Sequence, residues 1–144
     1  MSESQEFKNL LFGLVKQAKR DIERRFTQAN IVITPFEYGV LSILKHNPAT
    51  LAEVAKKLGI RPPSALPYVD ALEKKKIILR HTDSKDRRKV LLNLTNKGQK
   101  IVQSIMKEHP QDILNQSFRK LSSSKQQQLL SLLSELTQTL NKYE

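Results

Sequence analysis

The stretch that decides the fold runs from Thr82 to Gly98 and reads TDSKDRRKVLLNLTNKG. Residues 83–89 are a charged turn, and residues 90–95 are a short apolar run of strand length. A second short run, IILRH at residues 77–81, precedes the turn. Two strand-length segments that flank a polar turn predict a β-hairpin, and the turn would place a cluster of cations at its tip.

The N-terminal part of the chain has helical periodicity. Apolar residues recur there at every third or fourth position: Phe7, Leu10, Leu11, Leu14, Ala18, Ile22 and Phe26. This spacing predicts one long amphipathic helix. The sequence Thr34-Pro35-Phe36-Glu37 then has the pattern of a capping box with proline at the first helical position. We expect a second helix from there to about Asn47-Pro48.

The centre of the chain has the spacing of a helix-turn-helix. Thr50 and Glu53 repeat the capping-box pattern, and Gly59 is placed to end this short helix. A third helix is expected between Pro63 and Lys76. Because the expected hairpin follows directly, the sequence predicts a mainly α fold with a small β-hairpin, which is a winged helix-turn-helix.

The C-terminal part predicts further amphipathic helices. Thr95 is a candidate cap for one of them, and Pro110 is expected to bend or end it. A leucine-rich helix follows, for which Ser123 and Ser124 are alternative caps, each with a glutamine three residues later.

The apolar residues are concentrated at both ends of a single expected domain, residues 1–144. Residues 34–98 hold the helix-turn-helix and the hairpin, whereas residues 1–30 and 99–144 hold helices more apolar than a peripheral helix requires. We expect these end segments to form a homodimer interface, because a chain of this size offers little core for so many leucines. A two-fold axis would also place two recognition helices about one turn of DNA apart. The alternative is that the end helices pack on each other within a monomer.

The charge of the chain favours a polyanionic partner. The formal net charge is +11 and the pI is about 10.0. Fourteen cations and five acids lie between Lys45 and Lys100, so this segment carries +9 of the excess. A localised positive surface is typical of proteins that bind nucleic acid or an anionic membrane surface.

Several functional classes are disfavoured. Without cysteine the chain has no disulfides, thiolate zinc sites or thiol-based redox sensing. His46, His81 and His109 are far apart and lack accompanying acids, so we expect no metal site and no cofactor. No pattern of a catalytic site occurs, so we expect no enzyme. The acidic start differs from a secretory signal, and no apolar run reaches membrane-spanning length, so we expect a cytoplasmic location and no membrane partner.

Three blocks carry a resemblance to a known family. They are residues 51–60 (LAEVAKKLGI), residues 69–75 (VDALEKK), and the run from Asp86-Arg87-Arg88-Lys89-Val90 to Leu94-Thr95-Asn96-Lys97-Gly98. In this order they resemble the multiple-antibiotic-resistance-regulator (MarR) family of winged-helix transcription regulators, whose wing signature is Asp-x-Arg, a strand and Leu-Thr-x-x-Gly. The resemblance implies an obligate homodimer that binds double-stranded operator DNA, usually as a repressor. It also implies release by a small phenolic or carboxylate ligand bound between the dimerisation and DNA-binding regions.

The wing supplies the first candidates for DNA contact. At the positions that match the family, the resemblance implies that Asp86 orients the wing and that Arg88 enters the minor groove. Arginine is suited to a narrow, electronegative groove because its planar cation is weakly hydrated. On a regular strand these two residues would share a face. The flanking Lys85, Arg87 and Lys89 favour groove or phosphate contact over the alternative, a solvated charged loop.

The expected recognition helix departs from the family pattern at Leu66 and Pro67, where polar or basic residues are usual. A proline deep in a helix is costly, so we predict a helix that begins late, capped by Ser64, or one that bends at Pro67. Few side chains here form bidentate base contacts, so direct readout is expected to be modest. Side chains near the starts of the two central helices are candidates for contact with phosphates, base edges or thymine methyls. They are Thr50, Arg61, Ser64, Ala65, Leu66 and Tyr68.

Three lysines, Lys74-Lys75-Lys76, close this helix. They would complement the helix dipole, a role at least as well supported as DNA contact. Lys76 stands where the resembled family often has glycine.

Aromatic and basic side chains suggest a pocket for a small aromatic or carboxylate effector. The candidates are Phe36 and Tyr38, together with Arg20 or Arg24 from the first helix of a partner chain. The alternative is core packing for Phe36 and simple solvation for the arginines.

Three functions remain open at this point. The first is a dimeric transcription regulator, a repressor released by a small ligand. The second is a DNA-compacting protein of the same fold with little sequence preference, which the high charge and the Leu66-Pro67 pair would suit. The third is an adaptor that binds a ligand or a protein and has lost operator reading.

Overall fold

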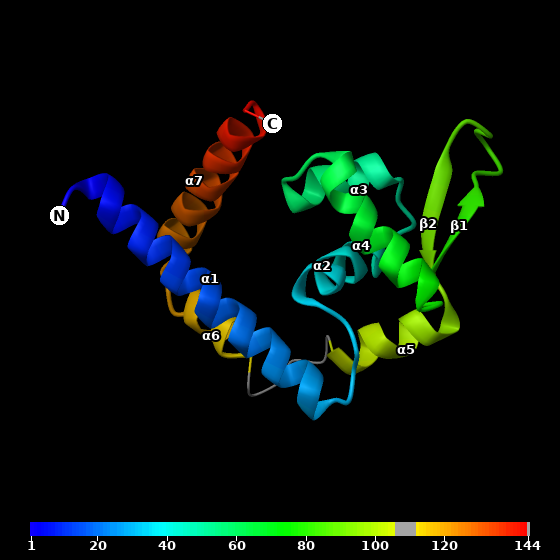
Figure 1. Ribbon diagram of the computed structural model, residues 1–144, viewed down its shortest axis with the longest axis horizontal. Coiled ribbons are helices and arrows are strands. Elements are labelled where there is room, and N and C mark those ends of the chain that lie inside the picture. The colour runs from blue at the N-terminus through cyan, green and yellow to red at the C-terminus, as the bar shows by residue number, and fades with distance from the viewer. Residues whose placement is uncertain (106–111, 144) are drawn as a thin grey trace.

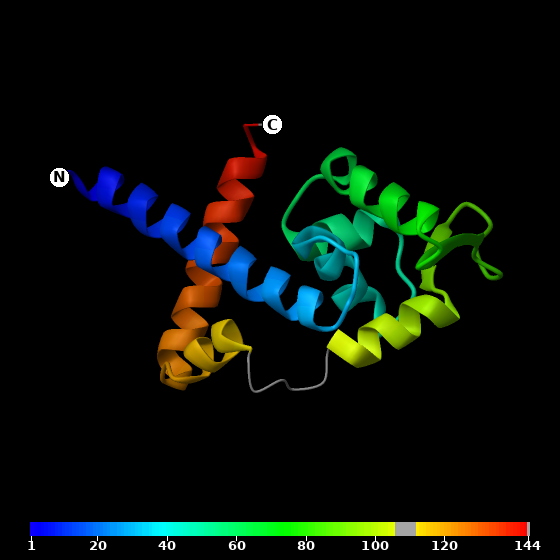
Figure 2. The ribbon, with the colours of Figure 1, turned by 60° about the horizontal axis from the view of Figure 1, so that its bottom comes forward.

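The computed structural model describes residues 1–105 and 112–143 and confirms a mainly helical fold with one small hairpin (Figure 1). We call residues 34–105 the head. It contains α2 (Pro35–Leu44), α3 (Leu51–Leu58), α4 (Pro62–Lys74), β1 (Ile78–Thr82), β2 (Val90–Leu94) and α5 (Asn96–Ile105). We call residues 1–30 and 112–143 the stalk. It contains α1 (Glu3–Gln28), α6 (Ile113–Arg119) and α7 (Ser123–Asn141). Figures 1 and 2 show the hairpin and the N-terminus at opposite ends of the molecule.

Both capping boxes form as the sequence predicts. The Thr34 hydroxyl accepts a hydrogen bond from the Glu37 N–H at 3.2 Å, and the Glu37 carboxylate accepts one from the Thr34 N–H at 3.3 Å. Thr50 and Glu53 repeat this exchange at 3.2 and 3.0 Å. Gly59 ends α3 with φ of 71°, a conformation that a residue without Cβ adopts easily.

The second helix is shorter than predicted. It ends at Leu44 instead of continuing to about Asn47-Pro48. A proline disfavours helical backbone in the residue before it. Ala49 then forms an isolated antiparallel bridge with Leu92 of β2, so this connection is extended and joins the hairpin to the helix-turn-helix.

Helix α4 begins earlier than predicted. Arg61 is its N-cap, with extended backbone and no side-chain cap, and the tandem prolines Pro62 and Pro63 occupy the first two helical positions. Prolines suit these positions because the N–H groups there need no intrahelical partner. The prediction that Ser64 caps a late helix was therefore wrong, since its own N–H donates to the Arg61 carbonyl at 3.0 Å. The helix continues through Pro67.

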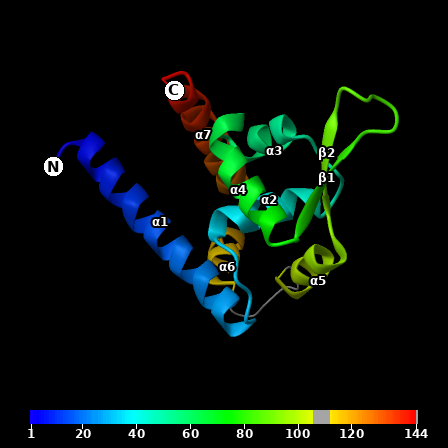
Figure 3. The ribbon, with the colours of Figure 1, turned by 45° about the vertical axis from the view of Figure 1, so that its right-hand side comes forward.

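The hairpin pairs β1 with β2 in antiparallel register, from Ile78 opposite Leu94 to Thr82 opposite Val90. The charged turn, residues 83–89, joins the strands and extends beyond the helices of the head (Figure 3). The sequence prediction of two short strands around this turn is confirmed.

A compact junction fixes the base of the hairpin. Lys76, between α4 and β1, has φ of 60° in the left-handed region. The Thr95 hydroxyl donates to the Lys76 carbonyl at 2.7 Å, and the Thr95 N–H donates to the Ile77 carbonyl at 3.0 Å. The same hydroxyl accepts from the Gly98 N–H at 3.1 Å, which confirms Thr95 as the cap of α5. A Cβ atom at Gly98 would clash with the Ile77 carbonyl.

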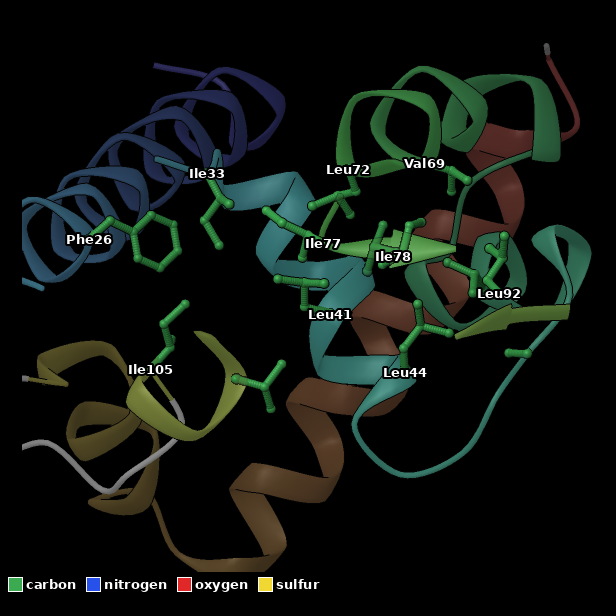
Figure 4. Packing of buried hydrophobic residues seen from close by; sticks show 14 residues of the cluster. Phe26, Ile33, Leu41, Leu44, Val69, Leu72, Ile77, Ile78, Leu92 and Ile105 are labelled. Atoms are coloured by element: carbon green, nitrogen blue, oxygen red, sulfur yellow. The ribbon is translucent and has the colours of Figure 1, made fainter. Parts of the chain in front are cut away.

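The core lies where α2, α4 and the hairpin meet (Figure 4). Leu41, Leu72, Ile78 and Leu92 are almost completely buried at its centre. Phe26 extends this core to α1. The burial of these side chains supplies most of the driving force for closing the head.

The N-cap of the last helix lies one residue before Ser123 and two residues before Ser124, which were the two predicted caps. The Ser122 hydroxyl accepts from the Lys125 N–H at 3.3 Å, so Ser122 is the N-cap of α7. Ser123 and Ser124 lie in the first turn of the helix and cap nothing, which corrects the prediction. Both neighbours are serines, so the cap is decided by where the chain turns and not by residue type.

Contacts between α1 and α6 hold the stalk together. Asp21 is buried on α1, and its carboxylate accepts from the Leu114 N–H at 3.5 Å. Arg25 pairs with Asp112, the N-cap of α6, at 3.5 Å. Sequence analysis did not predict α6 as a separate helix. The predicted break at Pro110 lies outside the described residues.

Apolar side chains remain exposed on the stalk. On α1 they are Phe7, Leu10, Phe12, Leu14 and Val15, and on α7 they are Leu130, Leu132, Leu133 and Leu140. These nine side chains of the stalk are therefore not buried within the chain.

The end of α7 contacts the turn of the helix-turn-helix. The Asn141 side-chain amide donates to the Gly59 carbonyl at 3.0 Å. A Cβ atom at Gly59 would lie 2.5 Å from the Thr137 methyl group. This contact joins the stalk to the head.

We predict that Gly98→Ala lowers the free energy of unfolding by about 2–3 kcal/mol, because the new methyl group meets a backbone carbonyl that cannot move without shifting the hairpin. Denaturant unfolding followed by circular dichroism measures the effect. Gln99→Ala on the same helix, at an exposed position, is the control and should change stability by less than about 0.5 kcal/mol. Equal stability of the two variants would contradict the described junction.

We also predict that Lys76→Gly raises the free energy of unfolding by about 1 kcal/mol, because glycine adopts φ of 60° without a Cβ penalty. The matched variant Lys74→Gly lies inside α4 and should instead lose up to about 1 kcal/mol. Thermal melts of both variants and the parent test these opposite signs.

Candidate nucleic-acid interface

The wing tip holds an ion pair between a half-buried carboxylate and an exposed guanidinium. The Arg88 Nε and backbone N–H both donate to Asp86 Oδ1 at 3.1 Å, and Arg88 Nη2 donates to Oδ2 at 3.3 Å. The Arg88 side chain is 91% exposed, whereas that of Asp86 is 31% exposed. Asp86 thus holds the arginine in place while most of the guanidinium surface stays open to a partner.

These two residues do not share a strand face, as a regular strand would require. They lie in the turn between β1 and β2. The turn is stabilised by its own backbone, since the Lys89 N–H donates to the Asp86 carbonyl and the Asp83 N–H donates to the Lys89 carbonyl, both at 2.9 Å. The pairing of Asp86 with Arg88 therefore depends on a tight turn and not on strand periodicity.

The electrostatics of the tip agree with this geometry. Hydrogen bonds from the Arg88 side chain and backbone, with the charge of Lys89, lower the pKa of Asp86 below 3.8. Asp86 is thus ionised at neutral pH and the pair is intact. The other cations of the turn, Lys85, Arg87 and Lys89, are exposed. They surround Arg88 with positive charge.

Helix α4 presents few side chains suited to reading bases. Ser64 and Leu66 are exposed, and Arg61 is exposed at the N-cap. Ala65 is completely buried in the head, so its predicted contact with thymine methyls is incompatible with the structure. Tyr68 is half-buried, and its ring stacks on Phe36 with centroids 5.0 Å apart.

The start of α3 offers a further polar position. Thr50 is half-buried, and its hydroxyl is engaged in the capping box with Glu53. The Lys56 and Lys57 side chains lie in the last turn of the same helix and are exposed. A helix N-terminus capped in this way keeps its dipole available to a phosphate group.

The effector candidates are not brought together within one chain. Phe36 stacks on Tyr68, whereas Tyr38 packs against Phe26 with ring centroids 5.6 Å apart. Arg20 and Arg24 lie on α1 beside a cavity of about 480 Å³ between α1 and α6. Arg24 also bonds to Asp21 at 2.7 Å.

Two cations of the head, Lys75 and Arg80, form ion pairs between elements that were not anticipated from sequence. Lys75 binds the buried carboxylate of Glu37 at 2.7 Å, so one of the three lysines that close α4 neutralises an acid of α2. Arg80 of β1 binds both Asp70, at 2.6 Å, and Glu73 of α4. Neither pair has a local sequence pattern, because the partners meet only after the helix and the strand have packed.

Within residues 1–105 and 112–143, no three His, Asp or Glu side chains gather closely enough to hold a metal ion. Every helix in the described part of the chain is too short or too polar to cross a lipid bilayer.

Two short helices around a tight turn, followed by an exposed cationic hairpin, define a winged helix-turn-helix protein. Residues 33–90, which hold these elements up to the start of β2, match the family model described as MarR family. This part of the chain is therefore similar to the MarR family.

Named transcription regulators and a solved structure are similar to this chain. The transcriptional repressor MdtR of Bacillus subtilis strain 168, an HTH-type protein, is 36% identical over 67 residues, which are 46% of this chain and 43% of MdtR. The uncharacterized HTH-type transcriptional regulator YkoM of the same organism is 32% identical over 100 residues, 69% of this chain and 64% of YkoM. The chain thus spans less than two thirds of either relative. A solved MepR-like protein, complexed with pseudoligands, shares the fold with a TM-score of 0.80 at 24% identity, over 99% of both chains.

We predict that the Asp86 carboxyl titrates below its ordinary value and that Arg88→Ala raises its pKa towards 3.8. Since the pKa is lowered in the folded state, the support that this carboxylate gives the wing is present at neutral pH and is lost as the pH falls through that pKa. Carboxyl ¹³C NMR titration measures both values. Lys89→Ala is the control and should move the pKa less, because its charge acts more weakly. An Asp86 pKa unaffected by the loss of Arg88 would contradict the geometry.

Proposed function

We propose that this chain is a dimeric DNA-binding transcription regulator, a repressor released by a small ligand. The observation that carries the proposal is the wing tip, where Arg88 is held by Asp86 yet 91% exposed among three further cations. A solvated loop would not need a fixed guanidinium, whereas a narrow minor groove attracts one. The kinship with a named transcriptional repressor, MdtR, supports the same function.

Dimerisation is proposed from the stalk. Its exposed apolar residues on α1 and α7 form surfaces that the chain itself does not cover. Contiguous exposed apolar surface marks an interaction site. A second copy is the natural occupant, because a two-fold axis would present two wings and two α4 helices to successive half-sites.

A small aromatic or carboxylate effector is proposed to bind between stalk and head. Phe36 supports this location, because its ring is 56% exposed at the start of α2 and stacks on Tyr68 of α4. A ligand that displaced Phe36 would disturb the helix beside the DNA. Arg20 and Arg24 of a partner remain the candidates for binding a carboxylate.

DNA as the proposed partner also bears on the class of protein and on its location in the cell. The relatives are named as transcription regulators, and we propose a binding protein and not an enzyme. Binding to chromosomal DNA implies a cytoplasmic location in a bacterium, the class of organism in which the relatives are found.

One observation favours a second candidate, a DNA-compacting protein with little sequence preference. Ala65 is buried, Tyr68 is stacked on Phe36, and Pro67 carries no donor, so α4 has few groups that discriminate bases. Phosphate contacts and DNA shape would then dominate binding.

We predict that Arg88→Ala weakens binding to a duplex selected from a random pool by about tenfold to a hundredfold, because it removes the cation placed for the groove. Fluorescence anisotropy at one fixed salt concentration measures the change. The melting temperature should stay within about 2 °C, since the side chain is exposed. The control is Lys120→Ala, an exposed cation of the stalk, which should bind as the parent does.

The same assay separates the candidate functions. A regulator binds its selected duplex at least a thousandfold more tightly than a random one, whereas a compacting protein shows a steep salt dependence without that ratio. Unchanged affinity of Arg88→Ala at physiological salt would refute the role of the wing.

A further inference from the structure

Helix α4 carries two carboxylates on the side that faces the hairpin. Asp70 and Glu73 are three residues apart, so they lie on one side of the helix, and their side chains are 58% and 43% exposed. A negative charge on an exposed side of a DNA-reading helix repels phosphates. The net charge of +11 favours binding to DNA, whereas these two acids oppose it. A cation beside them would remove this opposition.

Arg80 of β1 supplies that counter-charge to both acids. Its Nη2 atom lies 2.6 Å from Asp70 Oδ1, and its Nη1 atom binds Glu73 Oε1. The Arg80 side chain is 29% exposed and so lies mostly between the helix and the strand. The planar fork of arginine can bind two carboxylates at once, which the single ammonium of lysine cannot reproduce with the same geometry.

The two arginines of the hairpin are therefore arranged in opposite ways. Arg88 at the tip is bound to one carboxylate of its own turn and is almost fully exposed. Arg80 near the base is bound to two carboxylates of another element and is mostly covered. The charge of Arg80 is neutralised by carboxylates of the protein itself, so this residue is poorly placed to contact a phosphate.

We infer that Arg80 is a positioning residue for DNA binding, which neutralises Asp70 and Glu73 so that these acids do not repel a bound duplex. The inference rests on the proposed function. Without Arg80 the two carboxylates would be unpaired and partly exposed on the helix that is proposed to read DNA.

A rescue experiment tests this role. Arg80→Met keeps the side-chain length but removes the charge, and it should weaken binding to the selected duplex by roughly tenfold, because two carboxylates are left unpaired. Adding Asp70→Asn and Glu73→Gln to this variant removes the repulsion and should restore affinity to within about threefold of the parent. The double variant Asp70→Asn with Glu73→Gln, which keeps Arg80, is the control. Melting temperatures are recorded for all proteins.

The outcomes are distinguishable. Weak binding by Arg80→Met that is restored in the triple variant supports the inference, since a role in folding alone would not be rescued by neutralising the acids. Unchanged binding by Arg80→Met overturns it. Weak binding that the triple variant does not restore also overturns it, because repulsion by the two acids is then not the cause of the loss. If Arg80→Met does not fold, the Arg80→Lys variant takes its place. This variant retains one ion pair, so its affinity for the selected duplex must lie between the affinity of the parent for that duplex and the affinity of the parent for a random duplex. A parent protein that does not bind DNA refutes the proposed function itself.

Discussion

The carbonyl group of Ile77 is the point on which the geometry of the head depends. It accepts a hydrogen bond from the N–H of Thr95 at 3.0 Å and shares the proton of the Thr95 hydroxyl with the Lys76 carbonyl, and it lies where any side chain at position 98 would have to pass. Three elements therefore meet at one backbone atom: the end of α4, the base of the hairpin and the start of α5. The Leu-Thr-x-x-Gly part of the wing signature has its physical reason here, because threonine supplies the cap and the donor while glycine supplies the space.

Local patterns predicted local structure well. The capping boxes at Thr34 and Thr50, the glycine that ends α3, and the hairpin around residues 83–89 each depend on residues within a few positions of one another. Such patterns act before tertiary packing and survive it. The start of α4 was missed because a polar cap at Ser64 was preferred over the tandem prolines, whose fixed φ already suits the first helical turn.

The rest of the candidate interface could not be read from sequence, because it depends on packing between elements. Arg80 is seven and ten residues from its two acids, and only the turn at Lys76 brings β1 alongside α4. The burial of Ala65 and the stacking of Tyr68 likewise follow from how α2 lies against α4. A helical pattern indicates which residues share a face but does not say which neighbour covers that face. The charge total of +11 was visible from the start, whereas its distribution between free and paired cations was not.

The stalk is built from two segments that lie at opposite ends of the chain. This arrangement affects the order in which the parts of the protein fold during synthesis. All residues of the apolar cluster of the head have been synthesised once Ile105 has left the ribosome. This includes Phe26 of α1, which emerges much earlier. Asp21 and Arg25, however, find Leu114 and Asp112 only after the chain has emerged as far as residue 114. Helix α1 is therefore synthesised well before α6, and the apolar residues on its exposed side are uncovered during translation. Such uncovered apolar surface favours aggregation of the nascent chain until the stalk is assembled.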